Sequence, residues 1–140
     1  MVDKLSNELK EAVKLSEGYR ARVYKDTLDI DTIGYGFAIK DLELDKDICD
    51  MILDKKLNKL IKDVDNKFSF MDDIAVEAQD VVYEMCYQLG INGFSKFKKT
   101  IAYLRDEDYK MAAIEMLDSR WAKQTPNRAK RLSNIIKDLV

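Results

Sequence analysis

The chain has 140 residues, of which 46% are hydrophobic and 36% are charged, and its net charge is −2. It contains no histidine, which excludes zinc sites with imidazole ligands and the Cys–His and Ser–His–Asp nucleophile systems. With only five glycines and one proline, the composition favours a mainly helical domain with solvated outer faces and no long flexible linker.

The first elements along the chain are a helix and a small sheet. Apolar periodicity from Leu5 to Val13 predicts a helix over residues 3–16, and Gly18 marks its end. Residues 22–38 contain the β-forming side chains and a turn-forming aspartate pair, so they are predicted to form the small sheet.

The rest of the chain reads as helices, predicted over residues 45–67, 72–89, 95–104, 107–118 and 127–138. The first of these is largely charged and should be mostly solvated, whereas the helix over 72–89 is the most apolar and should lie at the centre of a helical lobe. Gly90 and Gly93 indicate a turn, and Pro126 suits the opening of the last helix.

This pattern predicts one domain over residues 1–140 with two lobes. We expect a small β-containing lobe over about 15–60 and a helical lobe over about 1–14 and 65–140. The long helix over about 45–67 would join them, and a polymeric substrate would bind in the cleft between lobes.

Cys49 and Cys86 each lie inside an apolar helical pattern, so we expect two reduced thiols that act as small core hydrophobes. Met1 to Lys4 lead straight into a charged amphipathic stretch, and no apolar run approaches the length of a membrane span. We therefore expect no signal peptide, synthesis in the cytoplasm and no unaided access to a cell wall.

The charge is unevenly distributed along the chain. Residues 41–84 carry a net charge of −7, and residues 119–140 carry +5. Such an asymmetry can orient a protein on an anionic polymer. Solvated helix faces give the same pattern and are the simpler interpretation.

Two carboxylates and a hydroxyl, Glu17, Asp26 and Thr32, are predicted at a helix end and on the following hairpin. Glycoside hydrolysis needs one carboxyl to protonate the leaving oxygen and another to act on the opposite face of the sugar. We hypothesise that Glu17 is the general acid, which must stay protonated near neutral pH, that Asp26 activates water and that Thr32 holds that water. A separation of about 6.5–9.5 Å would imply inversion and about 5–5.5 Å retention, and the sequence spacing leaves both open.

Taken singly, these residues have simpler interpretations, because a glutamate near a helix end is usually a surface residue and an aspartate in a hairpin is usually a turn former. Their order is more specific: Glu-Gly at 17–18, Tyr-x-Asp at 24–26 and Thr-Ile-Gly-x-Gly at 32–36. This order resembles the signature of the phage-type lysozymes, glycoside hydrolase family 24. The segments 87–90, 119–121 and 124–131 resemble the T-even phage lysozymes in particular, so that the similarity spans about residues 5–137.

The resemblance implies an α+β, mostly α-helical fold with a small N-terminal β-sheet, a long inter-lobe helix and a helical C-terminal lobe. It also implies an endolysin-type muramidase that cleaves the β-1,4 bond between N-acetylmuramic acid and N-acetylglucosamine with inversion. By position, Glu17 is the proton donor, Asp26 the second catalytic carboxylate and Thr32 the residue that positions water. The implied substrate-binding residues are Ala38, Tyr87, Gln88, Thr100 and Arg128.

The implied partner is bacterial peptidoglycan, with no cofactor, metal, nucleic acid or membrane partner, and we expect a monomer. The protein would be made in the host cytoplasm and would reach the wall through a separate membrane lesion. Three alternatives stay open: a catalytically weak or inactive peptidoglycan-binding domain on the same fold, a lytic transglycosylase that needs only one acidic residue, and a helical structural protein with a chance motif.

One departure from the family pattern has a structural consequence. Phe37 stands where the family usually has histidine, so Asp63 on the long helix would lose a cationic partner, which we expect to alter lobe packing rather than chemistry. Trp121 is expected to anchor the C-terminal lobe, and Arg128 could pair with Glu17 or with a wall-peptide carboxylate.

Overall fold

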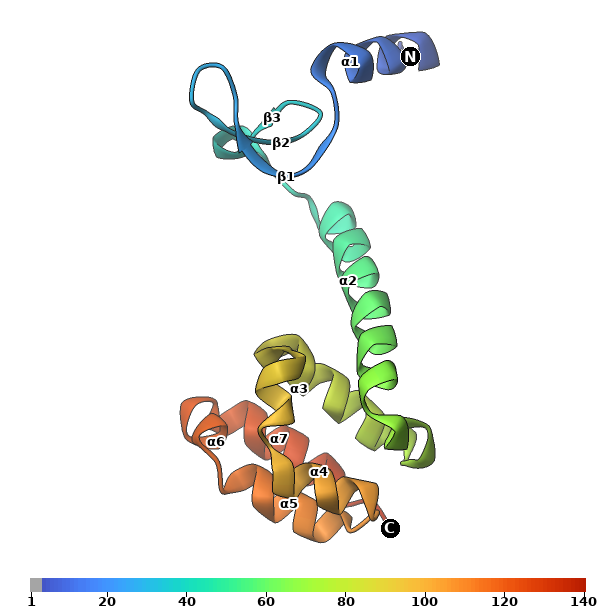
Figure 1. Ribbon diagram of the computed structural model, residues 1–140, viewed down its shortest axis with the longest axis vertical. Coiled ribbons are helices and arrows are strands. Elements are labelled where there is room, and N and C mark those ends of the chain that lie inside the picture. Colours follow the sequence, from blue (N-terminus) through green and yellow to red (C-terminus); the bar gives the residue numbers. More distant parts are fainter. Residues whose placement is uncertain (1–3) are drawn as a thin grey trace. The chain divides into compact units, whose positions relative to one another are not determined.

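The computed structural model describes residues 4–140, and it has a mostly helical α+β architecture (Figure 1). The chain divides into two compact units, Met1–Cys49 and Asp50–Val140, which we call the β unit and the helical unit. The mostly helical α+β class expected from the sequence, with a small N-terminal sheet, is confirmed. The boundary falls inside the long helix α2, Lys46–Lys67.

The β unit contains α1, Asn7–Glu17, followed by a three-stranded antiparallel sheet in the order β1-β2-β3. The strands are β1, Arg20–Lys25; β2, Asp31–Gly34; and β3, Phe37–Ala38. The helix begins later than predicted because the Ser6 side chain accepts a hydrogen bond from Leu9 N and caps the first turn. Residue 3, where the predicted helix begins, lies outside the described residues, as do Met1 and Val2.

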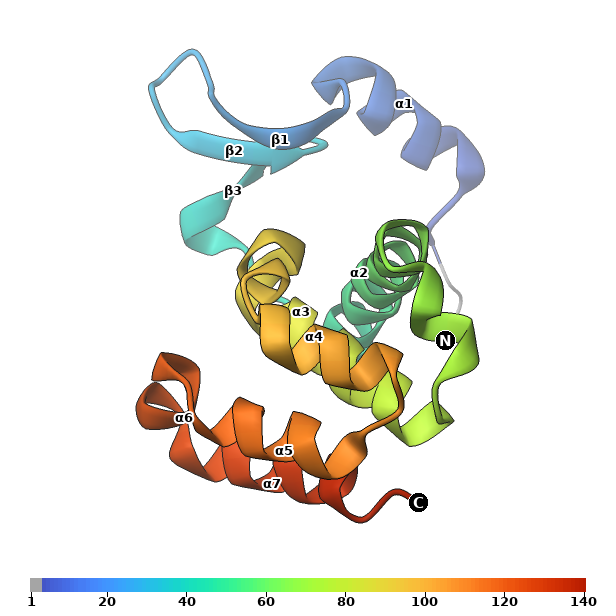
Figure 2. The same cartoon turned by 60° about the horizontal axis from the view of Figure 1, so that its bottom comes forward.

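The helical unit contains five further α-helices, together with most of α2. They are α3, Val76–Ser95; α4, Lys98–Arg105; α5, Tyr109–Leu117; α6, Arg120–Gln124; and α7, Pro126–Lys137. Short 3₁₀ helices cover Ile39–Asp41 in the β unit and Ser69–Asp73 before α3. Helices α5 and α7 lie side by side, and α4 packs on α5 (Figures 1 and 2).

The hydrophobic core runs from Val64 to Ile136 and therefore lies in the helical unit. Helix α3 contributes Val81, Val82, Met85 and Cys86 to it, as expected for the most apolar helix. Of α2, only Val64 is buried, which agrees with its largely charged sequence. None of the helices within residues 4–140 is long and apolar enough to cross a membrane.

Several sequence-based details need correction. The predicted turn at Gly90 and Gly93 is a kink at Gly90 alone, where φ is 77° and ψ is 158°, and α3 continues to Ser95. Cys49 is exposed rather than part of the core, while Cys86 is buried, and burial raises the pKa of its thiol to about 12. Asp63 pairs instead within its own helix, since Lys59 Nζ lies 2.7 Å from its Oδ2 one helical turn away.

Candidate active site

Glu17 is the last residue of α1, where Gly18 ends the helix by donating its N–H to Lys14 O at 2.8 Å. The Glu17 carboxylate lies directly over Gly36, in the turn between β2 and β3, so that any side chain at Gly36 would collide with it. Lys14, one turn earlier on α1, lies with its Nζ 5.4 Å from the centre of the Tyr35 ring. These two contacts hold the end of α1 against the β2–β3 turn.

Thr32 lies on the central strand, paired with Tyr24 on β1 and with Ala38 on β3. Directly paired residues of an antiparallel sheet project to the same face, so Thr32 and Ala38 share a face. Thr32 is only 3% exposed, and its Oγ1 donates a hydrogen bond to Ile30 O at 2.8 Å. Since a hydroxyl has one donor and two acceptor sites, this bond leaves Oγ1 able to accept a further hydrogen bond.

Asp26 follows β1 at the start of the hairpin turn and is half-buried. Its Oδ1 accepts hydrogen bonds from Leu28 N at 2.8 Å and Ile30 N at 2.9 Å. Asp26 therefore forms the turn, as its residue type favours, and the same two bonds fix the direction of its carboxylate. Within residues 4–140 no hydrogen bond involves its second oxygen, Oδ2.

In the β unit, the Glu17 carboxylate therefore lies at the β2–β3 turn, while Thr32 is paired with Ala38 on one side and with Tyr24, two residues before Asp26, on the other. Gly36, which Glu17 covers, is two residues from Ala38, or at most about 7 Å along the chain. Phe37, which replaces the expected histidine, points its ring at Gly34, where an added Cβ would stand 2.8 Å from the ring.

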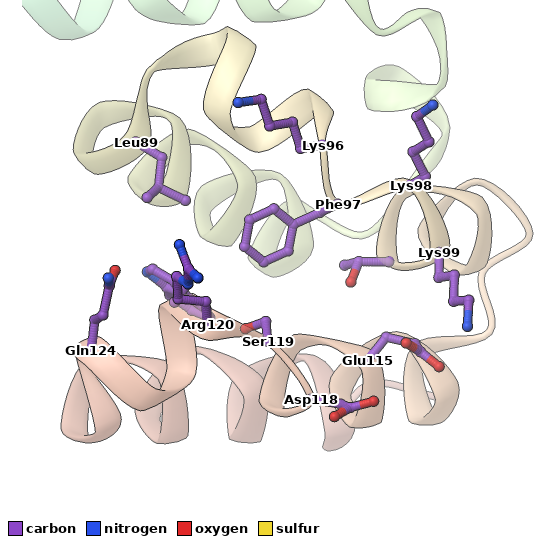
Figure 3. A pocket seen from close by; sticks show the side chains of 12 residues that line it. Leu89, Lys96, Phe97, Lys98, Lys99, Glu115, Asp118, Ser119, Arg120 and Gln124 are labelled. Atoms are coloured by element: carbon purple, nitrogen blue, oxygen red, sulfur yellow. The ribbon is translucent and has the colours of Figure 1, made fainter.

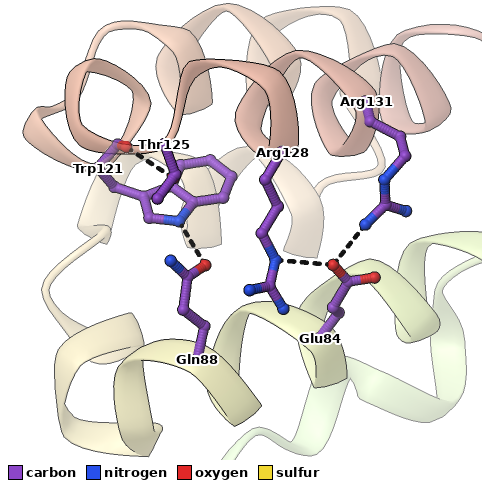
Figure 4. A network of polar contacts seen from close by, with 6 residues as sticks. All are labelled: Glu84, Gln88, Trp121, Thr125, Arg128 and Arg131. Carbon is purple, nitrogen blue, oxygen red and sulfur yellow. Dashed lines mark hydrogen bonds and ion pairs between the residues drawn. The ribbon is translucent and has the colours of Figure 1, made fainter.

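The other predicted substrate-binding residues lie in the helical unit, and two of them are engaged there (Figure 4). Gln88 on α3 accepts a hydrogen bond at its Oε1 from Trp121 Nε1 at 2.9 Å. Trp121 is 4% exposed, and its ring meets that of Phe97 edge-on at 5.9 Å, as expected of an anchor. Arg128 on α7 donates from Nε to Glu84 Oε2 at 2.8 Å.

Glu84 is also bonded to Arg131, whose Nη2 lies 2.6 Å from the same oxygen. Burial by itself opposes ionisation of Glu84, but the hydrogen bonds from Arg131 and Arg128 outweigh it and lower the pKa of this carboxyl. Sequence reasoning missed Glu84 as a partner of Arg128, because the two residues are 44 positions apart and belong to different helices.

Tyr87 and Thr100 line two different hollows of the helical unit. Tyr87 is half exposed beside Lys56 and Lys59, in a hollow of about 290 Å³. Thr100 is buried at the start of α4, where it helps to line a pocket of about 520 Å³. Figure 3 shows the Phe97 ring pointing into this larger pocket between Lys96 and Arg120. No motif in the sequence marks Phe97 or Lys96 as pocket residues.

No cluster of potential metal ligands occurs among residues 4–140. Glu17, Asp26 and the nearly buried hydroxyl of Thr32 belong to the same compact unit.

Comparison with known proteins identifies a family for this chain. The family model described as phage lysozyme matches residues 14–137. The curated protein "Probable T4-type lysozyme 1" of Dictyostelium discoideum is 26% identical, over 93% of this chain and 94% of that protein. "Probable T4-type lysozyme 2" of the same organism is 24% identical, over 92% of this chain and 93% of the relative.

A third relative has a different architecture. The "Pre-baseplate central spike protein Gp5" of Enterobacteria phage T4 is 25% identical over 96% of this chain, but the match covers only 28% of the spike protein. A unit of this kind therefore also occurs within a longer protein.

Proposed function

The chain belongs to the phage lysozyme family, and on that premise we propose that it is an endolysin-type muramidase whose catalytic residues are Glu17, Asp26 and Thr32. Family membership makes it a glycoside hydrolase, and it implies activity on peptidoglycan. The finer proposal is that it hydrolyses the β-1,4 bond between N-acetylmuramic acid and N-acetylglucosamine. The observation that carries it is the Glu17 carboxylate lying over Gly36, in the turn that joins the strands of the paired residues Thr32 and Ala38.

Glu17 is the proposed general acid. Its exposed carboxyl group can reach a substrate, and its contact with Gly36 holds it toward the sheet that carries the other two residues. Protonating the glycosidic oxygen as the bond breaks prevents the leaving sugar from departing as an alkoxide. A positioned acid of this kind contributes about 10²–10⁴-fold to the rate.

Asp26 and Thr32 are the proposed water-activating pair. Asp26 is oriented through Oδ1 by two backbone N–H groups, so Oδ2 is the oxygen that can accept a proton from water. Thr32 Oγ1 already donates to Ile30 O and can act toward water only as an acceptor. A water that donates one hydrogen to each of them keeps an oxygen lone pair for attack on the anomeric carbon.

Direct attack by this water inverts the configuration at the anomeric carbon, so inversion is the proposed stereochemical outcome. Retention would instead require a carboxylate to form a covalent bond with the sugar. The anomeric proton signals of freshly formed product, recorded by NMR before mutarotation, distinguish the two outcomes.

Ala38, Tyr87, Gln88, Thr100 and Arg128 are the proposed substrate contacts. Gln88 and Arg128 would bind with the nitrogens that Trp121 and Glu84 do not engage. We further propose that α2 joins a small lobe to a helical lobe, that the protein is monomeric, and that it reaches the wall through a membrane lesion made by another protein.

The test is loss of turbidity of chloroform-permeabilised Gram-negative cells, with the soluble products identified by mass spectrometry. Glu17→Gln and Asp26→Asn should each lower the rate by about 10²-fold or more while leaving the unfolding transition unchanged. Glu11→Gln is the matched control, because Glu11 is an exposed carboxylate on the same helix whose only described partner is Lys14 at 3.6 Å.

Clearing by Glu17→Gln at the wild-type rate would contradict the acid assignment. A 1,6-anhydro product from an active Asp26→Asn variant would identify a lytic transglycosylase instead. If wild type binds the wall without cleaving it, the chain is a peptidoglycan-binding domain on a lysozyme fold.

A further inference from the structure

Three aromatic side chains contact one another in a row at the β2–β3 turn, the turn over which the Glu17 carboxylate lies. The catalytic proposal does not use them. The ring centres of Tyr19 and Tyr35 are 5.5 Å apart with a tilt of 49°. Tyr35 in turn meets Phe37 edge-on, with centres 6.3 Å apart. Tyr35 and Phe37 flank Gly36 in the chain, so this aromatic row of Tyr19, Tyr35 and Phe37 adjoins the Glu17 carboxylate.

Both ends of the row are exposed to solvent. Tyr19 is 66% exposed and Phe37 is 47% exposed, although both are large aromatic side chains. Tyr35 is less exposed, since Lys14 covers one region of its ring with Nζ 5.4 Å from the centre. The less exposed Tyr35 ring therefore packs against the Tyr19 ring and limits its orientations. Because the Tyr19 side chain is already restricted, it loses less conformational entropy when a ligand stacks on it.

Tyr19 is also close to the proposed reaction. It follows Glu17 by two residues, with only Gly18 between them, so the two Cα atoms are at most about 7 Å apart. A ligand ring on Tyr19 would thus adjoin the bond that Glu17 protonates.

We propose that Tyr19, supported by Tyr35, is a stacking platform for an N-acetylated hexosamine ring of the glycan strand. This inference rests on the proposed role of Glu17. A pyranose with equatorial substituents presents its axial C–H bonds as an apolar, slightly electropositive face. The face of an aromatic ring carries the negative part of its quadrupole, so the two faces complement one another.

A sugar suits this surface better than a wall peptide does. The stem peptides of peptidoglycan carry charged ends that need ionic partners. Lys14 already lies over Tyr35 and 3.6 Å from Glu11, and Arg20, next to Tyr19 in the chain, lies over the ring of Tyr24 with its Cζ 4.5 Å from the centre. A neutral sugar ring needs only a flat apolar surface with polar groups around its edge, which Tyr19 supplies together with its hydroxyl.

The experiment measures binding in the Glu17→Gln background, so that the ligand is not consumed. The probe is a glycan strand of alternating N-acetylglucosamine and N-acetylmuramic acid whose stem peptides have been removed, titrated by calorimetry. Tyr19→Phe keeps the ring, whereas Tyr19→Leu keeps apolar bulk but loses the flat face. Leu15→Ala is the matched control, since Leu15 is an 87% exposed apolar residue at the same end of α1.

Tyr19→Leu should weaken binding about five- to tenfold, whereas Tyr19→Phe and Leu15→Ala should remain within about twofold of the parent. Sugar protons that stack on the ring should also shift upfield in the NMR spectrum, and this shift should disappear in Tyr19→Leu. A residue with a purely structural role would not produce the shift.

Unchanged affinity in Tyr19→Leu would overturn the platform and leave the catalytic proposal standing. If Tyr19→Phe binds as weakly as Tyr19→Leu, the hydroxyl rather than the ring face accounts for the affinity. If the loss of affinity accompanies a lower unfolding midpoint, it reflects a folding defect. Either result would also overturn the platform. Binding of free stem peptides but not of the strand would overturn both proposals. If Glu17 is not the general acid, the turbidity assay of Glu17→Gln shows this independently of the binding experiment.

Discussion

At the scale of single residues, the glycine at position 36 is explained by a contact rather than by its backbone alone. Gly36 and Gly90 have nearly the same positive φ, 75° and 77°, which disfavours a side chain at either position. An added Cβ meets nothing within 4 Å at Gly90, but at Gly36 it collides with the Glu17 carboxyl group. Substitutions at the two positions can therefore be compared, which separates the effect of backbone strain from the effect of displacing the Glu17 carboxyl group.

Gly36→Ala and Gly90→Ala should both destabilise the protein, by about 1–3 kcal/mol, because φ is positive at both positions and side chains of L residues rarely adopt that conformation. Gly36→Ala should also lower the lytic rate more than tenfold, since it moves the Glu17 carboxyl group, whereas folded Gly90→Ala should keep most of its rate. Urea unfolding and the turbidity assay measure the two effects. Similar rates for the two folded variants would show that the Gly36 contact does not position Glu17.

The catalytic candidates come from a local sequence pattern, whereas their surroundings depend on tertiary packing. The order of Glu17, Asp26 and Thr32 is local, so a motif of 20 residues captures it. The ring contact of Tyr19 with Tyr35 and the pairing of Arg128 with Glu84 arise from tertiary packing. Cys49 was placed wrongly because apolar periodicity identifies a stripe on a helix but does not establish what covers it.

At the scale of elements, the strongly periodic helices were predicted well and the short or interrupted ones were not. Helix α6 was missed because its five residues, RWAKQ, are too few to show a period. The end of α3 was placed too early because Gly90 is read as a helix terminator, whereas the chain resumes helical geometry after it. The start of α7 at Pro126 was correct, since proline is favoured in the first turn.

The Glu84 cluster links α3 to α7, and its contribution to stability should depend on pH. The folded state lowers the pKa of Glu84 below its ordinary value of 4.5, so the stabilisation is present above about pH 4.5 and is lost as the pH falls through the folded-state pKa. Glu84→Gln should cost about 1 kcal/mol at pH 7, a modest value because the cluster is partly exposed.

Urea unfolding of wild type and Glu84→Gln at pH 7 and pH 3 checks this prediction, and the difference between the two proteins should shrink at pH 3. Asp54→Asn is the control, because Asp54 is an exposed carboxylate on a different helix, α2, and does not line the hollow that Glu84 and Arg131 share. A difference between wild type and Glu84→Gln that is the same at both pH values would exclude an ionic contribution.

At the scale of the whole molecule, stability and the proposed chemistry reside in different units. The buried hydrophobic side chains run from Val64 to Ile136, whereas the described part of the β unit buries a single side chain, that of Thr32. Glu17, Asp26 and Thr32 all belong to the β unit. Regions with few buried contacts open locally at lower free energy than the core does.

Hydrogen exchange of the intact protein should therefore be uneven. Amides of β1 and β2 should exchange faster than amides at the centres of α3 and α7, measured peptide by peptide with mass spectrometry under native conditions. Raising urea below the unfolding midpoint should leave the β-unit rates nearly unchanged if they reflect local opening, while the core rates rise. Equal protection in the two units would mean that they unfold as one.

The position of α7 in the chain has a consequence for biosynthesis. Ala129, Leu132 and Ile136 belong to the core, so the apolar residues of α3 obtain their full set of partners only after the ribosome has added the last helix. At about 5–20 residues per second, the interval between Val64 and Ile136 lasts about 4–14 s. During that time the nascent chain exposes the apolar face of α3, and chaperones that bind such faces should engage it there. A messenger truncated before α7 would yield a polypeptide that carries every proposed catalytic residue but has no closed core to protect it from proteases.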